Sequence, residues 1–287
     1  MNYERFYTHT LCIAVASSTL LLGMLLLTAG IGWFFGGTIG IAMSFGVFFA
    51  CLVLGPTALD RKRITIRNGT AIPRHHALHL HLLVDELSRR AGLAGSPELV
   101  FVNSPQVNAF AVRHRKTPVL GLTEGLVRTL NFREIAAVMA HEISHLRTVQ
   151  IRVMETAHVL QSVISSLSLV GAALLLLSHQ SLDLTLAENS LALGLLLAGP
   201  VFSAIMLLGI TRLCEYEADL TAVRLSRDPV GLASALHKIH SRQHGFWNSI
   251  FSERIEKLRF LHTHPATERR IQRLLALSSS RTSAIPG

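Results

Sequence analysis

The stretch "AVMAHEISHLRTVQ", residues 137–150, contains two histidines four positions apart, and a glutamate follows the first. Just upstream, Asn131 can cap a helix, and Glu134 stands three positions later, as in a capping box. We therefore predict a helix over residues 131–145. The apolar side chains of its buried face are Ile135, Val138 and Met139.

A helix places His141 and His145 on one face, about one turn apart, so that both imidazoles can bind one metal ion. Glu142 lies beside them and can take a proton from a metal-bound water without being a ligand itself. This chemistry suits zinc, which lowers the pKa of a bound water to about 7. We predict one zinc ion per chain.

Two classes of metalloprotease are excluded by the residues around this motif. A metzincin continues with a glycine and a third histidine, where this chain has Thr148 and Ile151. An intramembrane metalloprotease carries its motif in an uncharged span, whereas charged residues occur throughout this stretch. They are Arg133, Glu134, Arg147 and Arg152.

A third ligand is predicted in "TRLCEYEADLTA", residues 211–222. Glu215 and Asp219 are four apart and share a helical face. Glu215 can complete a His, His, Glu site and leave the fourth position to water, while Asp219 can bind the second nitrogen of a ligating histidine. An acidic helix start without a metal is the alternative, which the histidine pair makes the weaker one.

The chain is 49% hydrophobic and only 16% charged, which is more apolar than a soluble domain of 287 residues. A membrane-spanning helix needs about 20 apolar residues. Residues 6–59 contain no charged side chain and have room for two spans, with a break around Thr28–Trp33. Residues 156–182 and 189–211 are uncharged as well, so we predict four transmembrane helices. A cleaved signal peptide is a weaker alternative for the first one.

Positive charge is retained on the cytoplasmic side of a membrane. The net charge of +9 includes four basic residues in "DRKRITIRN", residues 60–68, directly after the second predicted span. The predicted segments are a transmembrane hairpin (1–59), a cytoplasmic peptidase segment (60–155), a second hairpin (156–211) and a cytoplasmic segment (212–287). We expect no nucleic-acid partner, since juxtamembrane charge explains the basic balance.

The cytoplasmic segment predicts an α+β domain with a small sheet. A helix is expected between Arg74 and Arg90, ending near Gly92, followed by strands in 97–104 and 108–112 and, in 117–127, a third strand that leads into a helix. Histidines decorate the helix, and we interpret them as a polar face rather than a metal site. They are His75, His76, His79 and His81. In the second span, Gly32, Gly36 and Gly40 predict either close helix packing or merely the glycine content of membrane helices.

With these motifs the chain resembles the HtpX group of integral-membrane zinc metallopeptidases, which are relatives of the CAAX prenyl endopeptidases and have a gluzincin-like catalytic domain. The resemblance implies that "HEISH" supplies the ligands His141 and His145 and the base Glu142. It implies that "EYEAD" supplies the ligand Glu215, with Asp219 behind it.

The resemblance extends to two further segments. "NSPQVNAF", residues 103–110, resembles the strand whose Asn108 and Ala109 would hold the substrate backbone. "THPATERRI", residues 263–271, resembles a His-Pro segment, which implies His264 and Arg270 as groups near the substrate or its oxyanion. The chain departs from the family pattern at Arg113, Gln150 and Ala266.

These observations predict a zinc endopeptidase of the bacterial inner membrane with a cytoplasmic active site. The resemblance implies that it acts on membrane or misfolded proteins. Two other functions stay open at this point: an inactive membrane scaffold or chaperone-like protein of the same fold, and a processing peptidase for prenylated or lipid-linked C-termini.

Overall fold

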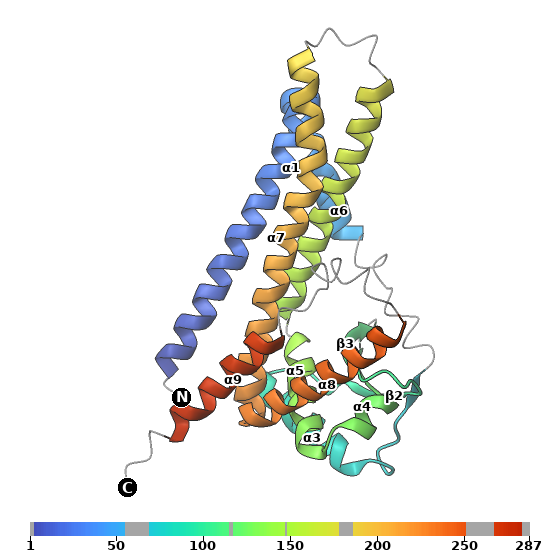
Figure 1. Ribbon diagram of the computed structural model, residues 1–287, viewed down its shortest axis with the longest axis vertical. Coiled ribbons are helices and arrows are strands. Elements are labelled where there is room, and N and C mark those ends of the chain that lie inside the picture. Colours follow the sequence, from blue (N-terminus) through green and yellow to red (C-terminus); the bar gives the residue numbers. More distant parts are fainter. Residues whose placement is uncertain are drawn as a thin grey trace. The chain divides into compact units, whose positions relative to one another are not determined.

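The structure, a computed structural model, describes residues 3–54, 69–114, 117–146, 148–177, 186–250 and 267–282. It divides into two units. The apolar unit comprises Leu11–Asp60 and Arg152–Leu213, and the sheet unit comprises Met1–Thr10, Arg61–Ile151 and Cys214–Gly287. The described part is mainly helical with one small mixed sheet, as predicted (Figure 1).

The apolar unit is built from helices α1 (Tyr3–Leu54), α6 (Thr148–Leu177) and most of α7 (Leu186–Ser226). Three stretches in the described residues are long and apolar enough to cross a membrane. They are Leu11–Phe34, Arg152–Ala173 and Leu193–Ser226. The second of the four predicted spans corresponds to a shorter apolar helix, Gly36–Ala50, so within the described residues three of the four predicted spans have full spanning length and the fourth is not confirmed.

The predicted break at Thr28–Trp33 is wrong, because these residues are helical and the chain turns later. The non-helical backbone lies at Gly36 and Gly37, where Gly37 has a φ of 53°. That left-handed conformation carries no steric penalty in glycine. Sequence hydropathy could not locate this turn, since the residues on both sides of it are equally apolar.

Gly32 and Gly40 lie on the two arms of this hairpin and not on one helix face. A Cβ on Gly32 would lie 2.6 Å from the carbonyl oxygen of Gly40, and a Cβ on Gly40 would collide with the carbonyl of Gly32. The two backbones therefore touch, as small residues allow in membrane helices. Close packing, one of the two interpretations of the glycines, is present here.

The three long helices pack on one another within the apolar unit. A Cβ on Gly199 of α7 would lie 3.2 Å from Ile31 of α1 and 3.4 Å from Ser168 of α6. Ser168 is itself buried, as are Leu160 and Ile164 on the same helix. The unit is thus a packed helical bundle that leaves many of its apolar side chains exposed on its outer surface, as lipid contact requires.

The sheet of the other unit has the strand order β1-β2-β4-β3. Its strands are β1 (Gly69–Ala71), β2 (Glu98–Val102), β3 (Ala109–His114) and β4 (Thr117–Thr123). β2 runs parallel to β4, while β1 and β3 pair antiparallel with their neighbours. The three predicted strands are confirmed, β1 was not predicted, and β3 is an edge strand.

Besides the last part of α7, the described residues of the sheet unit form five helices: α3 (Leu78–Ala91), α4 (Glu124–Thr129), α5 (Phe132–His145), α8 (Pro229–Ile250) and α9 (Thr267–Thr282). The predicted end of α3 at Gly92 is confirmed, with a left-handed φ of 72°. The capping box of α5 is confirmed too, because Asn131 and Glu134 bond each other's backbone N–H.

The core of the sheet unit lies between one sheet face and the helices. Side chains alternate along the strands, so that Leu99, Leu120 and Leu122 enter this core. The helices contribute Met139 and Ile143 of α5, both fully buried. This packing fixes α5 against the sheet, and the last turns of α5 carry His141, Glu142 and His145.

Candidate metal centre

Helices α5 and α7 bring the three predicted ligands together. His141, His145 and Glu215 each offer one ligand atom, and these atoms lie within 4.8 Å of one another. The two Nε2 atoms are 3.2 Å apart. The Glu215 oxygens lie 3.4 Å from Nε2 of His141 and 3.8 Å from Nε2 of His145. All three residues belong to the sheet unit.

These spacings fit a metal ion. Ligand atoms about 2.0–2.1 Å from a tetrahedral zinc are roughly 3.3 Å from each other, close to the distances here. Two imidazole nitrogens and one carboxylate are also the donor set that zinc binds in catalytic sites with an open fourth position. The residues present therefore fit the predicted ion.

The electrostatic surroundings of His141 favour positive charge at the same place. Nδ1 of His141 lies 3.1 Å from Oδ1 of Asp219. Burial opposes a charged imidazolium, but the Asp219 and Glu215 carboxylates outweigh it and raise the pKa of His141 to about 10. Either a proton or a metal cation meets this demand, and Asp219 occupies the position predicted for it, behind His141.

Glu142 is held by the sheet. The backbone N–H of Ala111 in β3 donates a hydrogen bond of 3.0 Å to Oε2 of Glu142. The side chain of Glu142 is half-buried on the α5 turn that carries His141. Since a carboxylate has about four lone-pair sites, one such bond orients the group and leaves capacity to accept a proton.

The edge strand β3 presents backbone groups beside the site. Thr123 N–H donates to the carbonyl of Asn108, so Asn108 faces β4, and the next residue, Ala109, faces away. The Ala111 N–H faces away as well, toward Glu142. Asn108 and Ala109 are the predicted substrate-binding residues, and of these Ala109 has its main chain directed to the open edge of the sheet. The Asn108 main chain is bonded to Thr123, and its exposed side chain remains available.

Arg270 reaches the site from α9 and is only 4% exposed. Its guanidinium donates to both carboxylate oxygens of Asp219, at 2.7 and 2.6 Å. Its third nitrogen, Nη1, lies 2.9 Å from Oε2 of Glu215. His264, predicted beside it, and Ala266 lie outside the described residues. The predicted contact of Arg270 with substrate stays a prediction.

Two residues that organise the site have no signal in the motifs. Ala111 acts through its backbone, and any residue other than proline could supply that N–H. Thr123 caps α4, which the pattern of a threonine before a glutamate and an apolar run could have indicated. Its hydroxyl also contacts the carbonyls of Gln106 and Asn108, at 2.6 and 2.7 Å, which no local pattern encodes.

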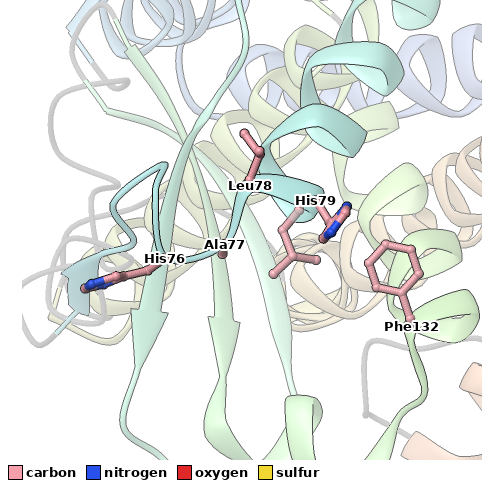
Figure 2. Close-up of a pocket in the computed structure, with 6 residues that line it drawn as sticks. His76, Ala77, Leu78, His79 and Phe132 are labelled. Atoms are coloured by element: carbon pink, nitrogen blue, oxygen red, sulfur yellow. The ribbon is translucent and has the colours of Figure 1, made fainter.

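The histidines near α3 form no second metal centre within the described ranges, where the only group of three potential ligands is the one above. His81 donates to the carbonyl of Ile72 at 2.9 Å. His76 and His79 line a shallow hollow with Leu78 and Phe132, and no carboxylate lines it (Figure 2). His75, His76 and His79 are exposed and His81 is half-buried, as a polar helix face requires.

Comparison with known proteins places this site in a family. The sequence pattern of peptidase family M48 matches residues 74–278. A "Protease HtpX homolog" of Pyrococcus abyssi is 31% identical over 271 residues, which cover 86% of this chain and 90% of that protein. One of Paraburkholderia phytofirmans is 29% identical over 266 residues, covering 86% and 91%.

The fold has a counterpart among solved structures. The crystal structure of S. mikatae Ste24p superposes with a TM-score of 0.51 at 18% identity, over 94% of this chain and 66% of that chain. The family match includes every residue of the metal centre, from the α5 motif to Arg270 on α9. The chain therefore belongs to peptidase family M48.

Proposed function

We propose that this protein is a membrane-anchored zinc endopeptidase that hydrolyses peptide bonds of membrane or misfolded proteins. Its active site would face the cytoplasm, at the bacterial inner membrane. The convergence of His141, His145 and Glu215 within 4.8 Å, with Glu142 on the same helix, carries the proposal. Membership of a peptidase family and three apolar helices of spanning length support it.

The chain's own residues account for the proton movements of the reaction. A zinc ion held by His141, His145 and Glu215 would polarise the scissile carbonyl and lower the pKa of the attacking water. Glu142, oriented by the Ala111 N–H, takes the proton of that water. The same carboxyl then gives the proton to the leaving amine nitrogen. Asp219 holds the orientation of His141 through Nδ1.

The edge strand β3 suggests how a substrate binds. An extended peptide can pair with the outward main chain of Ala109 and lie along the strand that also orients Glu142. Backbone pairing reads no particular side chain, which suits unfolded protein segments. The exposed Asn108 side chain stands next to this edge and can add a hydrogen bond to the peptide.

The complete ligand set favours this function over an inactive scaffold of the same fold, which has no need of three convergent ligands and an oriented base. A processing peptidase for prenylated or lipid-linked C-termini would recognise the lipid as well as the peptide. We expect an unmodified protein substrate to be cleaved and a prenylated peptide to give no additional rate.

The experiment compares the full chain in detergent with its Glu142→Gln variant. Glutamine keeps the size of the side chain and cannot act as a base, so casein cleavage should fall roughly 100- to 10,000-fold. Zinc content should stay at one ion per chain, because Glu142 is not a ligand. Glu124→Gln serves as the matched control and should cleave normally, because this half-buried carboxylate of α4 pairs with Arg128 and is not one of the metal-site residues.

Cleavage by Glu142→Gln at the wild-type rate would exclude the mechanism, and a wild-type protein that binds no zinc would exclude the metal. The substrates themselves can be found by comparing the membrane proteomes of cells that carry either form. True substrates should accumulate in cells with Glu142→Gln.

A further inference from the structure

Arg270 contacts two different carboxylates of the metal centre, those of Asp219 and Glu215. Asp219 and Glu215 stand one turn apart on the same face of α7, and the guanidinium lies against both. Nε and Nη2 bind the two oxygens of Asp219, and Nη1 faces Oε2 of Glu215. One planar group thus bridges two carboxylates that are four residues apart.

Both carboxylates lead on to the metal ligands. Glu215 is itself one of the three, and Asp219 lies 3.1 Å from Nδ1 of His141, a second one. Arg270 therefore influences two ligands by two separate routes. Partners behind metal ligands of this kind fix the orientation of the ligand and strengthen metal binding.

The geometry requires arginine in particular. The guanidinium has five N–H donors in a fixed plane, so that two edges of it can bind carboxylates at once, while an ammonium group is a point charge. Arg270 is 4% exposed, Asp219 6% and Glu215 12%, so none of the three can exchange its partner for bulk water. A buried charge of this kind is stable only with its partners in place.

We propose that Arg270 is a positioning residue of the metal centre, which sets the orientation of Glu215 directly and that of His141 through Asp219. Helix α9 is then a necessary part of the zinc site, although it supplies no ligand. This inference rests on the proposed zinc peptidase function. It differs from a role at the substrate oxyanion, in which Arg270 would affect turnover and leave metal affinity unchanged.

The test measures zinc affinity by competition with a chelator, using the full chain in detergent. Arg270→Gln removes the charge and the planar fork, and Arg270→Lys keeps the charge alone. Both should bind zinc about 10- to 100-fold more weakly than the wild type. With cobalt in place of zinc, both should show an altered visible spectrum, which reports ligand geometry. Arg269→Gln, an exposed neighbour on α9, should match the wild type in both measurements.

Wild-type zinc affinity in both Arg270 variants would overturn the inference. Wild-type affinity in Arg270→Lys alone would show that a positive charge suffices without the planar guanidinium, and this result would overturn the inference too. If Arg270→Gln does not fold, as judged by circular dichroism, Arg270→Lys decides. A wild-type protein that fails to bind zinc overturns the proposed function along with this inference, whereas a change limited to kcat overturns the inference alone.

Discussion

At the scale of single residues, Thr123 connects the start of β3 to the start of α4. Its hydroxyl accepts hydrogen bonds from the N–H of Asn108 and of Leu126 and lies 2.6 Å from the Gln106 carbonyl. The side chain is 3% exposed, so these bonds are made away from water. Thr123 therefore determines where the edge strand begins, beside the predicted substrate-binding residues.

Thr123→Val should lower the free energy of unfolding by about 1–3 kcal/mol, since it leaves buried backbone groups without a partner. It should also raise the KM for casein more than it lowers kcat, because it displaces the substrate edge and leaves the metal ligands in place. Thr123→Ser should restore both. Thr129→Val, which loses a helical bond to the Gly125 carbonyl, is the matched control; an equal KM change there would contradict the positioning role.

At the scale of elements, the hairpin within α1 depends on the contact of Gly32 with Gly40. Gly40→Ala would force the two backbones apart and should destabilise the protein in detergent by about 1–3 kcal/mol, as overpacking does. Gly46→Ala is the control, because within the described part of the chain a Cβ at that position meets no atom within 4 Å other than the backbone of its own helix. Thermal denaturation measures both, and equal midpoints for the two variants would show that the close approach is absent in solution.

Helix α5 is joined to α8 through Glu134. This carboxylate accepts hydrogen bonds from the Asn131 N–H, the Ser234 hydroxyl and the Lys238 ammonium, at 2.9, 2.6 and 2.8 Å. Burial raises the pKa of Glu134, but the bonds from Lys238, Ser234 and the backbone outweigh this effect and bring it below the ordinary value of 4.5. The bonds from Ser234 and Lys238 to Glu134 keep α5, the helix that carries the histidine motif, in place against α8.

The lowered pKa of Glu134 predicts how the stability of the protein changes with pH. The unfolded state takes up a proton on Glu134 near pH 4.5, and the folded state only below that. The stabilisation by Glu134 is therefore complete above pH 4.5 and is lost as the pH falls through the folded-state pKa. Glu134→Gln should be less stable at neutral pH and show a flatter decline in acid. Glu98→Gln, an exposed control, should follow the wild-type curve of stability against pH. If the stability of Glu134→Gln fell in acid as steeply as that of the wild type, the prediction would be contradicted.

At the scale of the whole molecule, the ligands impose a condition on membrane topology. His145 and Glu215 bind one ion only if they are on the same side of the membrane, and two candidate spans begin after the first of them, in α6 and α7. The basic residues of 60–68 favour the cytoplasmic side for this segment. We expect green fluorescent protein fused to the C-terminus to fluoresce in cells.

Alkaline phosphatase fused at the same point should be inactive, and phosphatase inserted in residues 183–188 should be active, because these residues connect the last two predicted spans. An active phosphatase at the C-terminus would contradict a cytoplasmic site. Neither result depends on catalysis, so the topology is tested separately from the chemistry.

The sequence alone was sufficient for the local parts of this protein. Helical spacing predicted that His141, Glu142 and His145 share one helix, and the spacing of Glu215 and Asp219 predicted a second ligand helix. Capping and alternation predicted α5, the end of α3 and three strands of the sheet. Such features depend on contacts within a few residues of each other, and these are written directly in the pattern of side chains.

Only the tertiary structure decided how these parts meet. The turn of α1 at Gly36 and Gly37, the bond from the Ala111 N–H to Glu142 and the bridge from Arg270 to Asp219 join residues that local patterns do not relate. The turn of α1 leaves no signal because the hydropathy on both sides of it is uniform. The bond from Ala111 leaves none because nearly every residue has a backbone N–H. The third spans 51 positions, where burial and charge pairing, rather than periodicity, select the partner.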